Sequence, residues 1–331
     1  MVSILILAID VLPDKFRITD VLFTGWLLNM VNRLFLTVLV LNLVVLASCA
    51  TVEKQQRTVY ETSIKADNAI KLQQADPVSV LRVATLNLAH GRKDSFNQIF
   101  VGEDSHKKNL DDIADVLIKY KPHVVALQEA DAPSHWSGRF DHVAYLAWGA
   151  QYPWRVHESN AQSWLFSYGT AVLSGLPLVE SIKHTFEPSP PTLDKGFVLA
   201  QIEWPCADEN KSRKVDVISV HLDFSRESVR EMQINEMLGI LSARKNPTII
   251  LGDFNSEWLA DVSGIKALVK KSRFVTYEPE GNNHNSYKNK RLDWILISKD
   301  LEFVSYQVLS DTLSDHKMVV SDIRFKGSLN K

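Results

Sequence analysis

After the polar residues 50–79, short apolar runs alternate with stretches in which apolar residues recur at helical spacing. Residues 107–120 and 225–245 have the spacing of amphipathic helices, whereas the shorter apolar runs are typical of strands. Lys121-Pro122 ends the first helix, and Ser225 followed by acidic residues opens the second. The runs predicted as strands are 81–88, 123–129, 169–178, 196–204, 214–224, 247–255, 291–298, 301–309 and 317–325.

The balance of strands and helices indicates the fold class. Many strands with few helices between them favour an α/β fold of two packed sheets over one doubly wound sheet. Chains of this size in α/β folds often form one domain. We therefore expect a single domain over residues 80–326.

The N-terminal part contains an apolar run of a different kind, residues 34–47, which follows Arg33. The run is short for a membrane span and typical of the hydrophobic region of a signal peptide. Its end, Leu46-Ala47-Ser48-Cys49, resembles a bacterial lipoprotein signal, in which cleavage leaves Cys49 as the lipidated first residue. The alternative is a buried or membrane-anchoring helix in which the cysteine has no role.

The lipoprotein hypothesis also predicts the location of the protein. Acyl chains on Cys49 would anchor it to a membrane, and Ala50 in place of aspartate indicates the outer membrane, with the domain of residues 80–326 extracytoplasmic. Residues 1–48 are then an N-terminal extension and signal peptide, and residues 49–79 are the lipidated cysteine with a polar tether. Met30 directly precedes the basic flank, so translation starts either there or at the first methionine.

Composition and charge exclude some classes of protein. The 331 residues are 45% hydrophobic and 23% charged, with a formal net charge of −2, as in ordinary soluble globular proteins. A protein that binds duplex DNA mainly through its phosphates usually has a clear basic surplus, and this sequence has none. The two cysteines, Cys49 and Cys206, exclude a disulfide framework and a cysteine-rich zinc site.

Polar side chains interrupt or terminate the predicted strands where apolar residues are expected. Each alone has a structural explanation, because Asn and Asp often cap turns. Their joint occurrence needs a different explanation, because converging carboxylates repel one another unless a cation lies between them. Oxygen ligands with free water positions suit Mg²⁺ or Mn²⁺, which also bind phosphate oxygens. The residues are Asn87, Glu129, His221, Asp253, Asn255, Asp293, Asp315 and His316.

Short motifs that contain these residues occur in order along residues 80–326. They are TLN (85–87), QE (128–129), GTAVLS (169–174), SVHLD (219–223), GDFN (252–255), RLDWIL (291–296) and SDH (314–316). In this order they resemble the endonuclease/exonuclease/phosphatase superfamily, which includes pancreatic-type deoxyribonucleases, abasic-site endonucleases, inositol-polyphosphate phosphatases and neutral sphingomyelinases. The resemblance implies a four-layer α/β/β/α sandwich of two packed, mainly antiparallel sheets flanked by helices.

The resemblance also implies a divalent metal site, with Mg²⁺ or Mn²⁺ as cofactor. Glu129 matches the family's principal metal ligand, with Asn87 beside it, and Asp315 matches a further carboxylate near the metal. Whether one or two metal ions bind stays open.

The catalytic roles that the resemblance implies fall on the other strand-end residues. Asp253 matches the residue that orients or deprotonates the attacking water, and Asn255 a donor to the phosphoryl oxygens. His316 is a general base or a cationic stabiliser, with its ring held by Asp293. His221 matches a second histidine that donates to a non-bridging oxygen. Which of Asp253 and His316 takes the proton of the water stays open.

Some further residues have two interpretations. Tyr168 either donates to the phosphate or packs in the core, and Asn285 and Tyr287 lie in a polar loop where relatives place substrate contacts. The loop 90–92 adds cationic contacts to the phosphate or is simply exposed. The residues expected either in a substrate groove or in the core are Trp136, Trp148 and Trp154.

The predicted function is therefore hydrolysis of phosphoric esters with Mg²⁺ or Mn²⁺, by in-line attack of water. A phosphodiesterase acting on a lipid headgroup or small ester outside the cytoplasm, as a monomer, is the first interpretation. The second is an extracytoplasmic nuclease for DNA or RNA, and the third is an inactive binding module with the same fold. The predicted site recognises the phosphate but not the group esterified to it.

Overall fold

The computed structural model describes residues 79–206, 211–281 and 283–327. All of them belong to one compact unit, residues 55–331. The predicted signal segment, the predicted lipidation site Cys49 and the predicted polar tether up to residue 78 lie outside the described residues. Among the described residues, no helix has the length and apolar character needed to cross a membrane.

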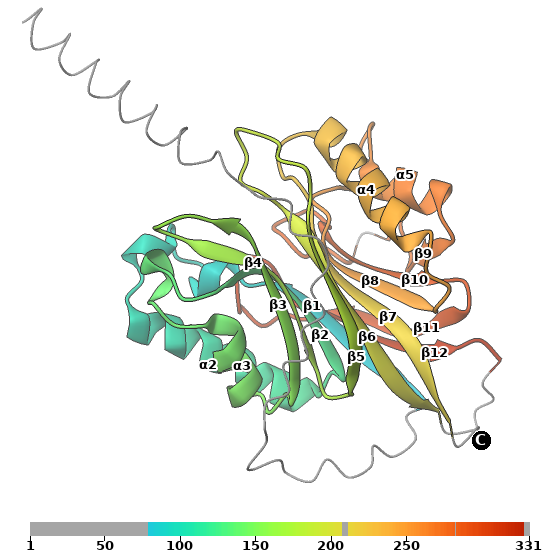
Figure 1. Ribbon diagram of the computed structural model, residues 1–331, viewed down its shortest axis with the longest axis horizontal. Helices are drawn as coiled ribbons and strands as arrows, with labels where there is room; N and C mark the ends of the chain where they lie inside the picture. The colour runs from blue at the N-terminus through green and yellow to red at the C-terminus, as the bar shows by residue number, and fades with distance from the viewer. Residues whose placement is uncertain (1–78, 207–210, 282, 328–331) are drawn as a thin grey trace, which may run out of the picture. The chain divides into compact units, whose positions relative to one another are not determined.

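Two six-stranded sheets make up the centre of this unit (Figure 1). The strands of the first sheet are β1 (Leu81–Asn87), β2 (Val124–Asp131), β3 (Trp154–Gln162), β4 (Ser167–Ser174), β11 (Leu301–Val308) and β12 (Val319–Phe325). Those of the second are β5 (Leu178–Thr185), β6 (Gly196–Cys206), β7 (Lys211–His221), β8 (Thr248–Asp253), β9 (Phe274–Thr276) and β10 (Asp293–Ser298). Their orders are β11-β12-β1-β2-β4-β3 and β5-β6-β7-β8-β10-β9.

Each sheet contains one parallel pair at its centre, β1 with β2 and β7 with β8. The remaining neighbours are antiparallel, which confirms the prediction of mainly antiparallel sheets. In a parallel pair, the carboxyl ends of both strands lie at the same edge of the sheet. The strand-end polar residues are thereby placed in two groups, one for each sheet.

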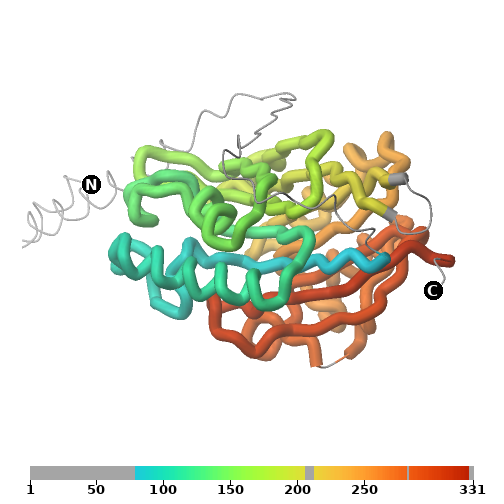
Figure 2. The backbone as a smooth tube through the Cα atoms, turned by 90° about the horizontal axis from the view of Figure 1, so that it is seen from below, coloured from blue at the N-terminus to red at the C-terminus, as the bar shows by residue number. Residues whose placement is uncertain are grey.

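Helices cover the outer faces of the two sheets (Figure 1; Figure 2). The helices α2 (Glu103–Tyr120) and α3 (His142–Gly149) pack on the first sheet. The helices α4 (Glu227–Leu241) and α5 (Gly264–Lys271) pack on the second. Between the sheets lies an apolar core that includes Val83, Val217 and Ile295, all with no exposed surface. The predicted four-layer sandwich is confirmed.

The predicted strands and both predicted helices are present, with α2 starting at Glu103 and α4 spanning Glu227–Leu241. The sequence did not predict β3, β5, β9, α3 and α5. The strands β3, β5 and β9 lie at sheet edges, and many of their side chains are only partly buried. The helices α3 and α5 have 8 residues each, too few to establish a helical period.

A buried histidine at the start of α3 predicts sensitivity to acid. The Nε2–H of His142 donates to the carbonyl of Ser137 at 2.8 Å, while its Nδ1 has no partner among the described residues. Burial lowers the pKa of His142 to about 4. The unfolded chain therefore binds this proton at higher pH than the folded protein does. Stability is lost as the pH falls from the ordinary histidine pKa toward 4, by about 2 kcal/mol between pH 7 and pH 5.

Urea denaturation at pH 7 and pH 5 measures this loss in the wild-type protein and in His142→Gln. The substitution lowers stability at pH 7 but should reduce the loss between the two pH values by about 2 kcal/mol. Burial also lowers the pKa values of His106 and His157, so part of the acid sensitivity remains in the variant. An equal loss of stability in both proteins would contradict the assignment to His142.

Candidate active site

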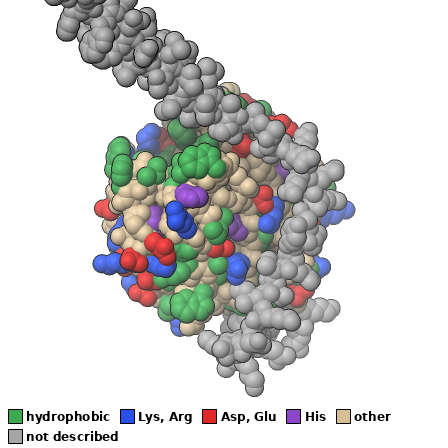
Figure 3. All heavy atoms as spheres, turned by 60° about the vertical axis from the view of Figure 1, so that its left-hand side comes forward, with side chains coloured by type: hydrophobic (Ala, Val, Ile, Leu, Met, Phe, Trp, Pro, Cys, Tyr) green, Lys and Arg blue, Asp and Glu red, His purple; other side chains and the backbone are tan. Residues whose placement is uncertain are grey.

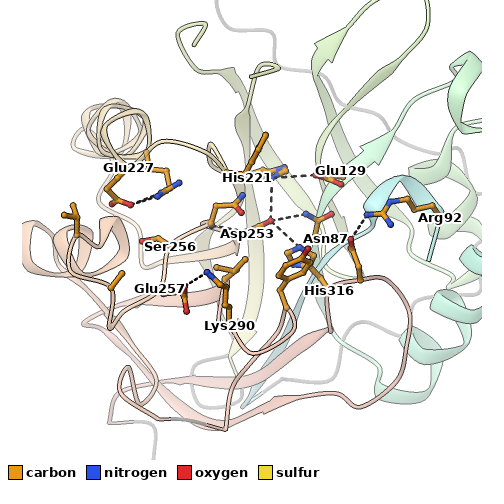
Figure 4. Close-up of a pocket in the computed structure, with 18 residues that line it drawn as sticks. Asn87, Arg92, Glu129, His221, Glu227, Asp253, Ser256, Glu257, Lys290 and His316 are labelled. Atoms are coloured by element: carbon orange, nitrogen blue, oxygen red, sulfur yellow. Dashed lines mark hydrogen bonds and ion pairs between the residues drawn. The ribbon is translucent and has the colours of Figure 1, made fainter. Parts of the chain in front are cut away.

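The two groups of strand-end residues face each other across one pocket of about 480 Å³ (Figure 4). Asn87 and Glu129 come from the first sheet, and His221 and Asp253 from the second. Other lining residues come from the loops at the same end of the sandwich. The full lining consists of Asn87, Arg92, Glu129, His221, Phe224, Glu227, Arg230, Asp253, Asn255, Ser256, Glu257, Ala260, Val262, Tyr287, Lys290, Leu292, Asp315 and His316.

His316 is held between two aspartates. Its Nδ1 lies 2.7 Å from Oδ2 of Asp293, and its Nε2 lies 3.8 Å from Oδ2 of Asp253. Because an ionised carboxylate can only accept, Nδ1 carries a proton and Nε2 faces the pocket. Burial alone would lower the pKa of His316, but Asp293 and Asp253 outweigh it and raise the pKa to about 10. The two carboxylates therefore favour the protonated ring.

The position of Asp253 depends on the glycine before it. Gly252 has φ +150°, and a Cβ there would lie 2.0 Å from the carbonyl oxygen of Val220. Only glycine lets β8 approach β7 this closely, which brings Asp253 into register with His221 and, on the other side, with Asp293.

Asn255 follows two residues later in the left-handed region, at φ 49°, which asparagine tolerates better than most residues. Its backbone N–H donates to Oδ1 of Asp253 at 2.9 Å, and its Nδ2 donates to the carbonyl of Leu222 at 3.0 Å. Both bonds fix the loop that follows β8 at the wall of the pocket.

Glu129 lies where β2 departs from regular pairing. The register with β4 shifts between Leu127 and Ala130, and Glu129 itself has φ 47°. An irregularity of this kind redirects a side chain, here into the pocket. Burial would raise the pKa of Glu129, but the nearby His90 and Lys195 outweigh it, and the pKa falls to about 2.

The Glu129 carboxylate, which faces the pocket, has the features of a metal ligand. The Glu129 carboxylate accepts no hydrogen bond from the described residues, and its oxygens lie 3.5 Å from Nε2 of His90 and 4.0 Å from Nε2 of His221. Beside it, Nδ2 of Asn87 donates to Oδ2 of Asp253 at 3.0 Å. Burial raises the pKa of Asp253 to about 7, and the neighbouring Asp293 adds to the rise.

The ligand atoms of Asp253, Asp293 and His316 lie within 4.8 Å of one another. Asp293 and His316 are already bonded to each other at 2.7 Å, however. The Glu129 carboxylate, which accepts no hydrogen bond from the described residues, therefore fits Mg²⁺ or Mn²⁺ better than this triplet does, with Asn87 beside it. Asp315, the other predicted ligand, lines the same pocket and accepts from Nη2 of Arg92 at 2.5 Å.

The structure brings most of the predicted site residues together. Asp293 lies fully buried behind His316 rather than in the lining, and Tyr287 lies with its ring 4.7 Å from that of His316. Asn285 is not part of the pocket lining. The residues that line the pocket as predicted are Asn87, Glu129, His221, Asp253, Asn255, Tyr287, Asp315 and His316.

The aromatic candidates lie outside the pocket lining. Tyr168 is buried, with its ring edge-on to His90 at 4.6 Å and stacked on Trp136 at 5.6 Å. Trp148 is 78% exposed on α3, and Trp154 starts β3. Tyr168 and Trp136 pack against His90 outside the pocket lining, whereas Arg92, from the loop 90–92, lines the pocket.

The sequence did not predict Lys195, which directly precedes β6. Its Nζ is buried and lies 3.3 Å from Nε2 and 3.4 Å from Nδ1 of His221. Burial and this cation together hold the pKa of His221 well below its usual value, so the imidazole is neutral. A lysine before a strand resembles any exposed residue, and no sequence signal distinguished it.

The model of the Endonuclease/Exonuclease/phosphatase family matches residues 219–316, which include His221, Asp253 and His316. No curated protein matches the sequence.

Several solved structures share the fold. An endonuclease/exonuclease/phosphatase from Beutenbergia cavernae is 19% identical, with a TM-score of 0.60, and the match covers 76% of this chain and 73% of that one. The human Nocturnin catalytic domain with bound sulfate is 20% identical, with a TM-score of 0.56 and coverage of 76% and 96%. A mannosyl-6-phosphatase from Bacteroides thetaiotaomicron is 18% identical, with a TM-score of 0.54 and coverage of 74% and 100%. At these identities the structures show the fold.

Proposed function

Since the chain is a member of the endonuclease/exonuclease/phosphatase superfamily by its fold and family signature, we propose that it is a divalent-metal-dependent phosphodiesterase. The superfamily includes phosphatases, nucleases and phosphodiesterases. The observation that carries the proposal is the meeting of Glu129 and Asn87 with Asp253, His221 and His316 in one pocket. Residues from both sheets thus provide a metal site and a set of proton-handling groups around the same space.

The proposed roles follow from this geometry. Glu129, Asn87 and Asp315 would hold Mg²⁺ or Mn²⁺, which neutralises phosphate charge and makes bound water more acidic. Asp253 has its Oδ2 between His221 and His316, at 3.6 Å and 3.8 Å, where it can orient water for in-line attack.

The remaining groups act on the phosphoryl oxygens. His316, held in one orientation by Asp293, places a positive charge at the pocket wall, where negative charge develops during attack. His221 is neutral beside the Lys195 ammonium, and Asn255 lines the wall next to them. His221 and Asn255 thus supply donors at the pocket wall, with Nε2 of His221 4.0 Å from Oε1 of Glu129.

The charges around the pocket favour a compact ester over a nucleic acid. Each of the cations in the lining, Arg92, Arg230 and Lys290, is paired with a carboxylate, at 2.5, 2.6 and 2.8 Å. On the face of the described residues in Figure 3, acidic and basic side chains are interspersed. A nucleic-acid backbone gains affinity from cations that are not already neutralised.

The mouth of the pocket offers an apolar surface instead. Phe224 and Val262 line the pocket and are 64% and 69% exposed. Exposed apolar groups beside a phosphate site suit the alcohol portion of a lipid or small organic phosphodiester. The lipoprotein signal ending at Cys49, outside the described residues, supports an extracytoplasmic, membrane-anchored enzyme, and this location is part of the proposal.

The test is an assay of the purified protein on bis(p-nitrophenyl) phosphate, sphingomyelin, plasmid DNA and RNA. We expect hydrolysis of one or both of the first two substrates with Mg²⁺ or Mn²⁺ and none with EDTA. A His316→Ala protein purified in the same way controls for contaminating hydrolases. Cleavage of nucleic acid alone, with a steep dependence on salt, would overturn the proposed substrate class. Inactivity on every substrate with both metals would overturn the proposed function.

A further inference from the structure

A second carboxylate–histidine pair lies behind Glu129, apart from Asp293 and His316. Nδ1 of His90 lies 2.8 Å from Oδ2 of Asp131, and Nε2 of the same ring lies 3.5 Å from Oε2 of Glu129. Since the Asp131 carboxylate can only accept, the ring donates to it through Nδ1 and turns Nε2 toward Glu129. His90 itself is not part of the pocket lining.

The surroundings of His90 hold its ring in this orientation. Asp131 is fully buried, and its Oδ1 accepts from Nε1 of Trp136 at 2.8 Å. Trp136 and Tyr168 contact the His90 ring edge-on, with centroid distances of 5.0 and 4.6 Å. The ring therefore has little freedom to rotate away from Glu129.

The backbone at His90 adopts an unfavourable conformation to place this ring. Ala89, His90 and Gly91 have φ values of 45°, 58° and 67°, a region that costs about 1 kcal/mol or more for each non-glycine residue. The turn is stabilised by Asn87, whose Oδ1 accepts from the N–H of Ala89 at 3.0 Å. It is also stabilised by Asn109, whose Nδ2 donates to the carbonyl of Gly91 at 3.0 Å. A strained turn that is fixed on both sides is typical of a functional position.

We propose that His90, held by Asp131, is a positioning residue that orients the Glu129 carboxylate for binding the divalent metal. The proposal rests on the proposed function, in which Glu129 is the principal metal ligand. His90 faces one oxygen of Glu129 and so restricts rotation of the carboxylate. Groups that orient a metal ligand in this way commonly change metal affinity by about 10-fold to 100-fold when they are replaced.

Two substitutions of His90 separate this role from a packing role. In His90→Gln, the side-chain amide reaches the position of Nε2 and can still donate toward Glu129. In His90→Asn, the shorter amide reaches only the position of Nδ1 and can bond Asp131 alone. Asparagine also tolerates the left-handed backbone at this position better than glutamine does. The asparagine variant should therefore be the more stable of the two and yet bind metal more weakly.

The measurement is the affinity of the full-length protein for Mn²⁺, by electron paramagnetic resonance without substrate, with thermal unfolding in parallel. We expect the Mn²⁺ Kd to rise about tenfold or more in His90→Asn and to stay closer to wild type in His90→Gln. At saturating Mn²⁺, kcat of His90→Asn should recover most of its loss. His142→Gln, which removes another buried histidine that does not contact Glu129, should leave the Mn²⁺ Kd unchanged.

Equal Mn²⁺ affinities in the two His90 variants, or an unchanged Kd in both, would overturn the inference. If the glutamine variant does not fold, an unchanged Mn²⁺ Kd in His90→Asn alone is sufficient to overturn the inference.

Glu129→Gln distinguishes failure of this positioning role from failure of the proposed function. If that variant loses Mn²⁺ while the His90 variants retain it, only the positioning role is wrong. If Glu129→Gln binds Mn²⁺ as tightly as wild type, the proposed metal site is wrong as well.

Discussion

His316→Ala should lower kcat/KM by about 10³-fold or more, the loss expected when a group that stabilises charge or transfers a proton is removed. The substitution removes the Nε2 that faces Asp253 and the pocket. It also leaves Asp293 buried without its 2.7 Å partner, while Oδ1 of Asp293 already has no partner among the described residues. An unpaired buried charge costs about 3–5 kcal/mol, so the variant should fold but unfold at a lower temperature.

A double variant distinguishes the catalytic loss from the structural one. His316→Ala with Asp293→Asn removes the unpaired charge and should regain part of the stability but none of the activity. His184→Ala is a matched control, because His184 makes a similar 2.6 Å pair with Glu236 and is not part of the pocket lining. Asp253→Ala should reduce activity to a comparable degree. Near-wild-type turnover in His316→Ala or Asp253→Ala would contradict these assignments.

Glu129→Gln should raise the Mn²⁺ Kd about 100-fold or more and abolish activity at ordinary metal concentrations. The substitution keeps the shape of the side chain and removes the negative charge that faces the pocket. Divalent metal ions bind carboxylates far more strongly than neutral amides in such sites. Titration of the apoprotein with Mn²⁺, by calorimetry or electron paramagnetic resonance, measures the effect.

Glu257→Gln is the control for Glu129→Gln. Glu257 lines the same pocket but pairs with Lys290 at 2.8 Å. Its substitution should leave the Mn²⁺ affinity unchanged. Equal weakening in both variants would indicate that Mn²⁺ responds to the general charge of the pocket rather than to one ligand, and would contradict the role of Glu129.

The candidate site was largely predictable because its residues end strands. Asn87 and Glu129 follow neighbouring parallel strands of one sheet, and His221 and Asp253 do so in the other, so each pair meets at a sheet edge. The pattern of strands alone does not predict that these edges of the two sheets face each other. The ordered motifs, read as a family resemblance, supplied that part of the prediction.

The contacts that the sequence did not predict join residues that are far apart along the chain. Lys195 reaches His221 across the β6–β7 pairing, and nothing in its local sequence distinguishes it from an exposed lysine. His90 and Asp131 are 41 residues apart, and their pairing depends on the left-handed turn after β1. The edge strands β3 and β5 were not predicted because the sequences of partly exposed strands have a weak pattern of apolar residues.

The division of the pocket between the two sheets has a mechanical consequence. Glu129 and Asn87 are attached to one sheet and His221 and Asp253 to the other, so their alignment depends on the packing and the hydrogen bonds between the sheets. A cavity made at Val217 or Ile295, far along the strands, would let one layer slide against the other. The packing between the sheets would then influence the turnover rate. Substitutions of core residues would change this rate without any change to a polar residue.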